Sequence, residues 1–213
     1  MTLNKPTVTA LSPNPQKPGY RDLYVDGEFY QTLPLELVAG QDLYVGAPFG
    51  EEEQAALLLA AQLIPAKEKA YQYLSYGDLS RKKLYEKLTR FGIEPQVAEA
   101  ACNKMEEQGF INDRRLAESL ARRYAEGKRW GPRRILPELI QKGLPGELAK
   151  EAVEELDTDF LQSAVYHLST KYRGRDLSDR KEVQKVIQGL VRLGFDYDTV
   201  RSALYELTEN FDE

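Results

Sequence analysis

The sequence predicts a mainly α-helical protein made of three tandem three-helix repeats, preceded by a small N-terminal β-rich domain. Three observations lead to this fold class. The first 50 residues alternate in hydrophobicity, helical periodicity begins at Glu51, and glycines recur 51 residues apart at Gly92, Gly143 and Gly194. Repeats stacked in sequence are expected to form an elongated, curved arm in which each repeat contacts mainly its neighbours.

The N-terminal segment 1–50 is the expected β-rich domain. Strand-like runs are expected at 7–11, 22–25, 28–32 and 43–45. Asp26-Gly27 lies between two of these runs and predicts a hairpin, because both central residues of a type I′ turn need positive φ. A helical turn is expected after Pro34, ending at Gly40. The buried face of a sheet of about three strands is assigned to Leu23, Val25, Phe29 and Leu43.

Residues 51–65 are expected to form a linker helix. Three glutamates in its first turn complement the helix dipole. Its apolar stripe is assigned to Ala55, Leu58, Leu59 and Leu63. Pro65 either kinks a long helix or precedes a new one at Ala66, and the sequence leaves both open.

The three repeats are expected at 66–108, 109–156 and 157–213. Each has apolar residues eight and four positions before its glycine, and one, nine and thirteen positions after it. The five columns are Leu84, Ile135 and Val186; Leu88, Leu139 and Leu190; Ile93, Leu144 and Phe195; Ala101, Ala152 and Ala203; Met105, Leu156 and Leu207. The glycines are therefore predicted to be left-handed helix C-caps. Asn112-Asp113 is expected to cap the first helix of the middle repeat, whereas Pro137 leaves the start of the next helix uncertain.

Residues 114–134 of the middle repeat are strongly basic in a chain whose formal net charge is -5. Its cations between positions 114 and 134 are Arg114, Arg115, Arg122, Arg123, Lys128, Arg129, Arg133 and Arg134. Glu118 and Glu126 are the acidic residues of this span and cannot neutralise them. Lys82-Lys83 occupy the positions of Arg133-Arg134 in the first repeat. The pattern favours a surface for a long anionic partner, and the alternative is a solvated face with local ion pairs.

Two further residues invite functional assignments. Trp130 lies between two glycines, where it either stacks on a base or fills a partner's socket, or seals the gap between adjacent helices. His167 is the one histidine, and Cys102, the one cysteine, is expected to be a buried filler. The chain lacks the phosphate-binding, nucleophile and metal-spaced motifs of common enzymes. We therefore expect no catalytic residue, cofactor or metal site.

The apolar runs are shorter than the roughly 18 to 20 residues needed to cross a bilayer, and the N-terminus is unlike a secretory signal. We expect a cytoplasmic protein without membrane contact. A single cysteine agrees with a reducing compartment.

The middle repeat carries a family resemblance. Its motifs are Gly109-Phe110-Ile111-Asn112-Asp113, Leu116-Ala117, Gly127-Lys128, Gly131, Arg134-Ile135, Glu138-Leu139 and Lys142-Gly143-Leu144. They resemble the central signature of the RecX family, regulators of the bacterial RecA recombinase. Tyr73-Leu74 and Ser80-Arg81 resemble that family's first module, and 21–29 is similar to the β extension of its longer members.

This resemblance implies a non-enzymatic inhibitor that binds in the groove of the RecA nucleoprotein filament. It also implies lower ATPase, strand-exchange and co-protease activities, and so regulation of DNA repair, recombination and the SOS response. The candidate contacts for RecA or DNA are Lys82, Lys83, Arg115, Arg122, Arg123, Lys128, Arg129, Trp130, Arg133 and Arg134. The alternative is a direct DNA-binding protein built from tandem helix-turn-helix-like modules. We expect a monomer that binds single-stranded or double-stranded DNA more weakly than it binds RecA.

Overall fold

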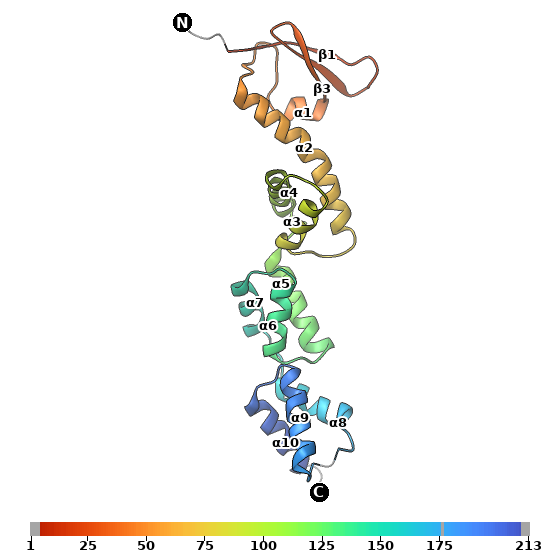
Figure 1. Cartoon of the computed structure of the whole chain (residues 1–213), viewed down its shortest axis with the longest axis vertical. Helices are drawn as coiled ribbons and strands as arrows, with labels where there is room; N and C mark the ends of the chain where they lie inside the picture. The colour runs from red at the N-terminus through yellow and green to blue at the C-terminus, as the bar shows by residue number, and fades with distance from the viewer. Residues whose placement is uncertain (1–4, 176, 210–213) are drawn as a thin grey trace. The chain divides into compact units, whose positions relative to one another are not determined.

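The structure is a computed structural model that describes residues 5–175 and 177–209 (Figure 1). Within these residues the chain is mainly helical, with ten α-helices and one sheet of three strands. The predicted fold class, a helical chain preceded by a small β-rich segment, is therefore confirmed. The chain divides into two compact units, residues 1–72 with 88–104 and residues 73–87 with 105–213.

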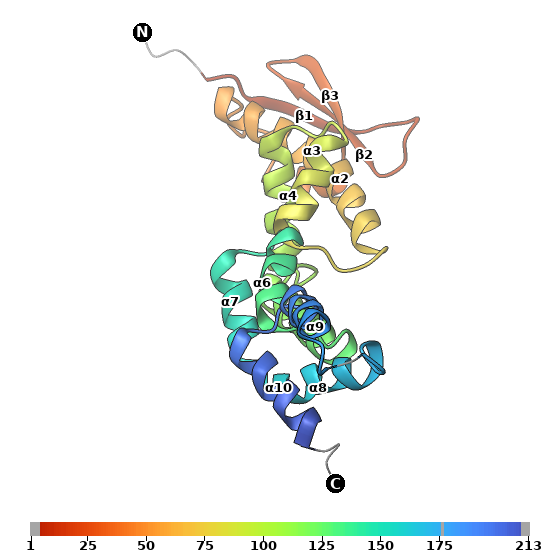
Figure 2. The ribbon, with the colours of Figure 1, turned by 60° about the horizontal axis from the view of Figure 1, so that its bottom comes forward.

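The N-terminal sheet is antiparallel, with β1 (Val8–Pro13), β2 (Tyr20–Val25) and β3 (Glu28–Pro34) in the order β1-β2-β3. The predicted turn joins β2 to β3, because Asp26 and Gly27 have φ values of 49° and 88°. The short helix α1 (Leu35–Gly40) follows at once, as predicted. The sheet lies against the first half of α2 (Figure 2), and α1, labelled in Figure 1, packs on the same core. The core between them contains Leu23, Leu33, Leu37, Phe49 and Leu57.

Three predictions for this segment were wrong in detail. Residues 43–45 form no strand, and instead Thr7 forms an isolated bridge with Pro48. Phe29 is 58% exposed because the register shifts between Leu23 and Tyr24, which places Phe29 opposite Tyr24 on the outer face. The buried stripe of α2 is displaced by about two residues toward the C-terminus from the expected one. It consists of Leu57, Ala60, Ala61 and Ile64, whereas Leu58 is 59% exposed.

The helix α2 (Glu51–Leu74) is continuous over 24 residues and contains Pro65 in its interior. Of the two alternatives left by the sequence, one long helix is therefore the observed one. Pro65 removes one backbone N–H from this helix, and its ring is exposed to solvent.

The remaining helices follow the repeat. The first repeat continues with α3 (Arg81–Arg90) and α4 (Pro95–Glu107). The second contains α5 (Asp113–Arg122), the π-helical turn η1 (Arg123–Gly127), α6 (Pro132–Gln141) and α7 (Gly146–Glu154). The third contains α8 (Phe160–Lys171), α9 (Arg180–Arg192) and α10 (Tyr197–Glu209). The helix α6 begins at Pro132 and continues through Pro137, so Pro137 does not delay the start of this helix.

The apolar columns and the capping glycines are confirmed. The residues eight and four positions before each glycine are at most 1% exposed. Gly92, Gly143 and Gly194 have φ values of 98°, 86° and 97°. The residue after each glycine donates its N–H to the carbonyl five positions earlier, at 3.1 to 3.3 Å. This is the Schellman arrangement, which satisfies carbonyl groups at the helix end.

Within the second unit, consecutive repeats are joined twice by a hydrogen bond between equivalent positions of the repeat. Ser80 Oγ donates to the carbonyl oxygen of Lys142 at 2.7 Å, and the N–H of Gly131 donates to the carbonyl oxygen of Leu193 at 2.8 Å. Ser80 and Gly131 each lie twelve positions before the glycine of their own repeat. Their acceptors are the residues just before the next capping glycine. The capping glycines therefore also mark the contacts between repeats.

Candidate functional site

The exposed side of α5 carries the cations that the sequence singled out. Arg115, Arg122 and Arg123 line a groove of about 350 Å³, together with Glu118, Ser119 and Glu126. The three arginines are exposed, and Arg115 and Arg122 share one side because residues seven apart on a helix face the same way. Three cations against two carboxylates leave this groove positively charged. We call this surface the α5 face.

A second groove, of about 450 Å³, borders the α5 face within the second unit. Ser119 and Arg123 line both grooves, so the two are continuous. Its floor contains the apolar side chains of Leu79, Leu116 and Leu120. Its cations are Lys83, Lys87, Arg123 and Lys142, and Asp78 is its one carboxylate. The combined surface therefore joins cationic rims to an apolar floor, which suits a partner with acidic and apolar groups.

Trp130 lies between the cores of the second and third repeats. It packs against both hydrophobic clusters, and its ring centroid is 5.1 Å from that of Tyr124. The guanidinium carbon of Arg134 and Nζ of Lys128 lie 3.9 and 4.2 Å from the centroid of its ring. The geometry agrees with the gap-sealing interpretation, since the indole fills the junction of two repeats. The two cations are placed there by cation–π attraction.

Arg129 is placed differently from the arginines of the α5 face. Its guanidinium carbon lies 4.3 Å from the ring centroid of Tyr166, and its backbone has a φ of 50°. Its carbonyl oxygen lies 2.9 Å from Nε2 of His167, so the one histidine ties α8 to the loop before α6. Arg129 and His167 therefore help to hold the junction between repeats.

The paired cations Lys82-Lys83 and Arg133-Arg134 occupy the first turns of α3 and α6. A helix N-terminus carries partial positive charge, so cations there destabilise the helix by about 0.3 to 1 kcal/mol each at low ionic strength. Lys83 forms an ion pair with Glu86 at 2.8 Å, and Lys82 and Arg133 are exposed. The helix dipole therefore does not account for these residues, whereas local contacts hold Lys83 on Glu86 and Arg134 on Trp130.

Carboxylates at the repeat junctions have shifted pKa values. Burial raises the pKa of Asp113 above its ordinary value, although the N–H of Arg81 donates to its carboxylate at 2.9 Å. Hydrogen bonds from Thr199 lower the pKa of Asp196, and the positive charge of Arg133 lowers it further. The sequence predicted that Asn112-Asp113 caps α5, but Asp113 is not the N-cap. Asn112 has that role, accepting from the N–H of Arg115 at 2.9 Å.

The part of the chain that the structure describes has no group of three or more His, Cys, Asp or Glu side chains placed to hold a metal ion. None of its helices is long and apolar enough to cross a membrane. Cys102 is fully buried, as predicted.

The structure brings together only some of the residues that the sequence proposed. Arg115, Arg122, Arg123 and Lys83 line the continuous grooves, whereas Lys128 and Arg134 lie on Trp130. Sequence reasoning missed Lys87, Lys142 and the apolar floor. No spacing along the chain relates Lys142 to Lys83, because the joint between repeats alone places them on one groove.

These features define a modular helical protein, with three-helix domains joined end to end in sequence and a cationic surface on the middle one. Family models describe three such domains. The first three-helix domain of RecX matches residues 66–105, the second matches 112–153 and the third matches 157–204. A "Regulatory protein RecX" of Clostridioides difficile (strain 630) is 34% identical over 194 residues, 90% of this chain and 91% of its own. The chain therefore belongs to the RecX family.

A further relative and two solved structures are also similar to this chain. A "Regulatory protein RecX" of Vibrio campbellii is 33% identical over 68% of this chain and 94% of its own. A crystal structure of a regulatory protein RecX has a TM-score of 0.70 at 24% identity, over 92% of this chain and 97% of that one. RecX from Lactobacillus salivarius has a TM-score of 0.62 at 27% identity, over 70% of this chain and 98% of that one. The first of these structures shows the fold.

Proposed function

We propose that this protein is a non-enzymatic regulator that binds the RecA nucleoprotein filament and lowers its ATPase, strand-exchange and co-protease activities. Membership of the RecX family supports the choice of partner. The observation that carries the proposal is the cationic α5 face in a chain of net charge -5, because a local positive surface selects a local anionic one. We further propose that the protein acts as a cytoplasmic monomer in DNA repair and the SOS response.

The α5 face is tested by reversing two of its charges. Arg115→Glu with Arg122→Glu changes exposed side chains outside the core, so the fold should persist. RecA bound to single-stranded DNA is assayed for ATP hydrolysis against increasing amounts of each variant. We expect half-inhibition to require at least about ten times more of this variant. Arg129 is left intact because its ring contact and positive φ belong to the repeat junction.

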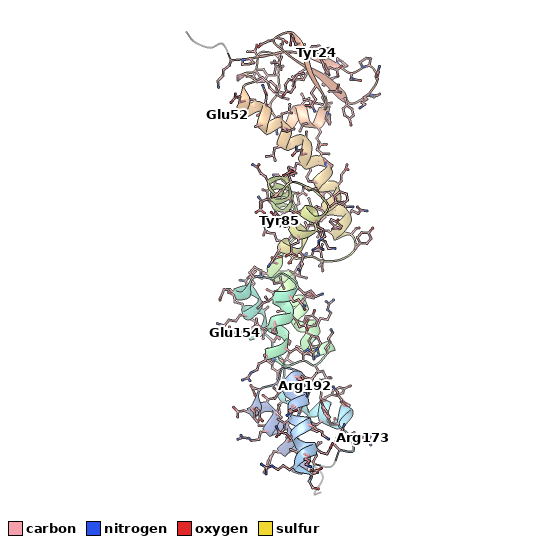
Figure 3. All side chains as sticks on the ribbon, viewed as in Figure 1. Tyr24, Glu52, Tyr85, Glu154, Arg173 and Arg192 are labelled. Carbon is pink, nitrogen blue, oxygen red and sulfur yellow. The ribbon has the colours of Figure 1, made fainter. Side chains whose placement is uncertain are left out.

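The matched control is Arg173→Glu with Arg201→Glu. It makes the same change in net charge, on exposed side chains of the third repeat; Figure 3 labels Arg173 there. It should inhibit RecA like the unchanged protein. Equal inhibition by all three proteins would contradict the assignment of the α5 face, and no inhibition by the unchanged protein would contradict the RecA partnership.

Direct DNA binding is the second candidate function, and the arginine-lined groove is the observation in its favour. Binding to single-stranded and double-stranded oligonucleotides is measured without RecA over a range of salt concentrations. A steep decrease of affinity with salt, together with tight binding, would support this function. Weak binding would leave RecA as the partner.

A further inference from the structure

The strand β3 is an open edge of the N-terminal sheet. It pairs with β2 on one side, and within residues 5–175 and 177–209 no other strand pairs with it. The other edge strand is partly covered, because the N–H of Val8 donates to Ala47 and the carbonyl of Val8 accepts from Gly46, at 2.9 and 2.8 Å. An open edge presents unpaired N–H and C=O groups, which are a template for another strand.

A groove of about 310 Å³ lies between β3 and α2, both in the first unit. Tyr30 and Gln31 of β3 form one wall, and Glu51, Gln54 and Leu58 of α2 form the other. Tyr30 is 42% exposed and Leu58 is 59% exposed, so apolar surface is available at the groove. An edge strand beside a helix with an apolar groove between them is the arrangement in which extended peptides bind by adding a strand.

The charge of the segment that forms this groove selects the kind of partner: Glu51 is the one charged residue in the groove lining, and the one cation on the neighbouring strand β2 is Arg21, opposite Leu33. Residues 22–66 contain no lysine or arginine. They contain eight carboxylates: Asp22, Asp26, Glu28, Glu36, Asp42, Glu51, Glu52 and Glu53. Figure 3 shows Glu52 in the first turn of α2, and this N-terminal part of α2 lines the groove. Such a field repels nucleic acid and a second copy of the same acidic segment, and it attracts a cationic polypeptide.

We propose that the groove between β3 and α2 binds an extended segment of a partner protein in which basic residues alternate with apolar ones. The segment pairs with the open edge of β3, its apolar side chains contact Tyr30 and Leu58, and its cations face the surrounding carboxylates. This interaction lies outside the α5 face. The protein therefore has a second docking surface, independent of the one assigned to RecA.

The test uses the full chain and labelled synthetic peptides. The probe is a short peptide in which lysine alternates with valine, and its controls have glutamate for lysine or N-methyl groups at alternate peptide bonds. Fluorescence anisotropy measures affinity, and hydrogen exchange with mass spectrometry measures amide protection in β3. We expect the lysine peptide to bind at least about tenfold tighter than either control and to protect β3 amides. N-methylation removes pairing donors without changing the side chains.

Variants of the protein locate the site. Leu58→Ser removes apolar surface from the groove, and Val45→Ser is the matched control because Val45 is 60% exposed and lies outside the groove lining. Leu58→Ser should weaken peptide binding at least about threefold, and Val45→Ser should leave it unchanged. Both variants keep the α5 face and should inhibit RecA normally, so this proposal and the proposed function can fail separately.

Several results would overturn the proposal. One is equal affinity for the lysine and glutamate peptides, and another is binding that survives N-methylation. Protection of β3 by self-association, seen without peptide as a dimer in sedimentation velocity, would assign the edge to a second copy. Direct binding of labelled single-stranded DNA to the protein, weakened by Leu58→Ser, would assign the groove to nucleic acid.

Discussion

Asp113 shows how one residue can serve a helix other than its own. Its carboxylate accepts the N–H of Arg81 at 2.9 Å, and Ser80 Oγ accepts the N–H of Lys83 at 3.2 Å. Two N–H groups in the first turn of α3, which have no partner within the helix, thereby gain acceptors. One of the two acceptors, Asp113, belongs to the next repeat. Partial burial of a carboxylate in this role raises its pKa, because the charged form is less well solvated.

This residue predicts a pH-dependent difference between variants. The folded pKa of Asp113 is raised above its ordinary value of 3.8. Folding therefore favours the protonated carboxyl group of Asp113. The resulting stabilisation is fully present below pH 3.8, and it is lost as pH rises through the folded pKa. Asp113→Asn keeps an acceptor for the N–H of Arg81 but has no charge. Urea unfolding should show Asp113→Asn gaining stability relative to the unchanged protein between pH 3.5 and pH 7.

Asp113→Ala is the control for the hydrogen bond. It leaves the N–H of Arg81 without its acceptor, so we expect a loss of about 0.5 to 2 kcal/mol in the free energy of unfolding at both pH values. If Asp113→Asn and Asp113→Ala were equally stable at pH 7, the acceptor would contribute nothing.

At the scale of one element, α6 combines a favourable and an unfavourable proline. Pro132 occupies its first turn, where a missing N–H costs nothing and the fixed φ suits a helix. Pro137 lies in the interior and is exposed, so it removes the N–H that would bond to the carbonyl of Arg133. The helix persists because Ile135 and Leu139 are fully buried in the hydrophobic core of the second repeat. Packing therefore outweighs local preference here.

Pro137→Ala should stabilise the protein. An alanine restores the backbone hydrogen bond and removes the clash of the ring, which should add about 1 to 3 kcal/mol to the free energy of unfolding. Fluorescence of Trp130, the one tryptophan of the chain, follows the transition at this repeat. Pro132→Ala is the opposite control and should cost about 0.4 to 1 kcal/mol. A loss of stability in Pro137→Ala would mean that the ring makes a contact of its own.

At the scale of the molecule, the second and third repeats are held by close backbone approach. The N–H groups of Gly131 and Arg133 donate to the carbonyls of Leu193 and Gly194, at 2.8 and 3.1 Å. A Cβ built on Gly131 would overlap the carbonyl group of Gly194. Gly131 has a φ of -78°, which any residue adopts. Glycine is therefore needed at position 131 for the close approach to Gly194, and not for its backbone conformation.

Gly131→Ala and Gly92→Ala separate the joint from the cap. Gly131→Ala should force the second and third repeats apart and cost about 1 to 3 kcal/mol, as overpacking does. Faster hydrogen exchange in 160–207 and altered Trp130 fluorescence should accompany the loss. A Cβ at Gly92 meets nothing within 4 Å, but its φ of 98° is strained for alanine, so Gly92→Ala should cost about 1 to 2 kcal/mol without changing that fluorescence. Unchanged exchange in Gly131→Ala would show that the joint tolerates a methyl group.

The sequence by itself determined the repeat, the capping glycines, the buried columns and the Asp26-Gly27 hairpin, because these depend on residues close together in the chain. It also identified the family and the cations of the middle repeat. The tertiary structure decided which cations share a groove, what lies beneath them and which residues join the repeats. Lys83, Arg123 and Lys142 line one groove, and Gly131 lies against Gly194, because backbones from different repeats approach closely. Such approach follows from packing between helices, which no local pattern of residues records.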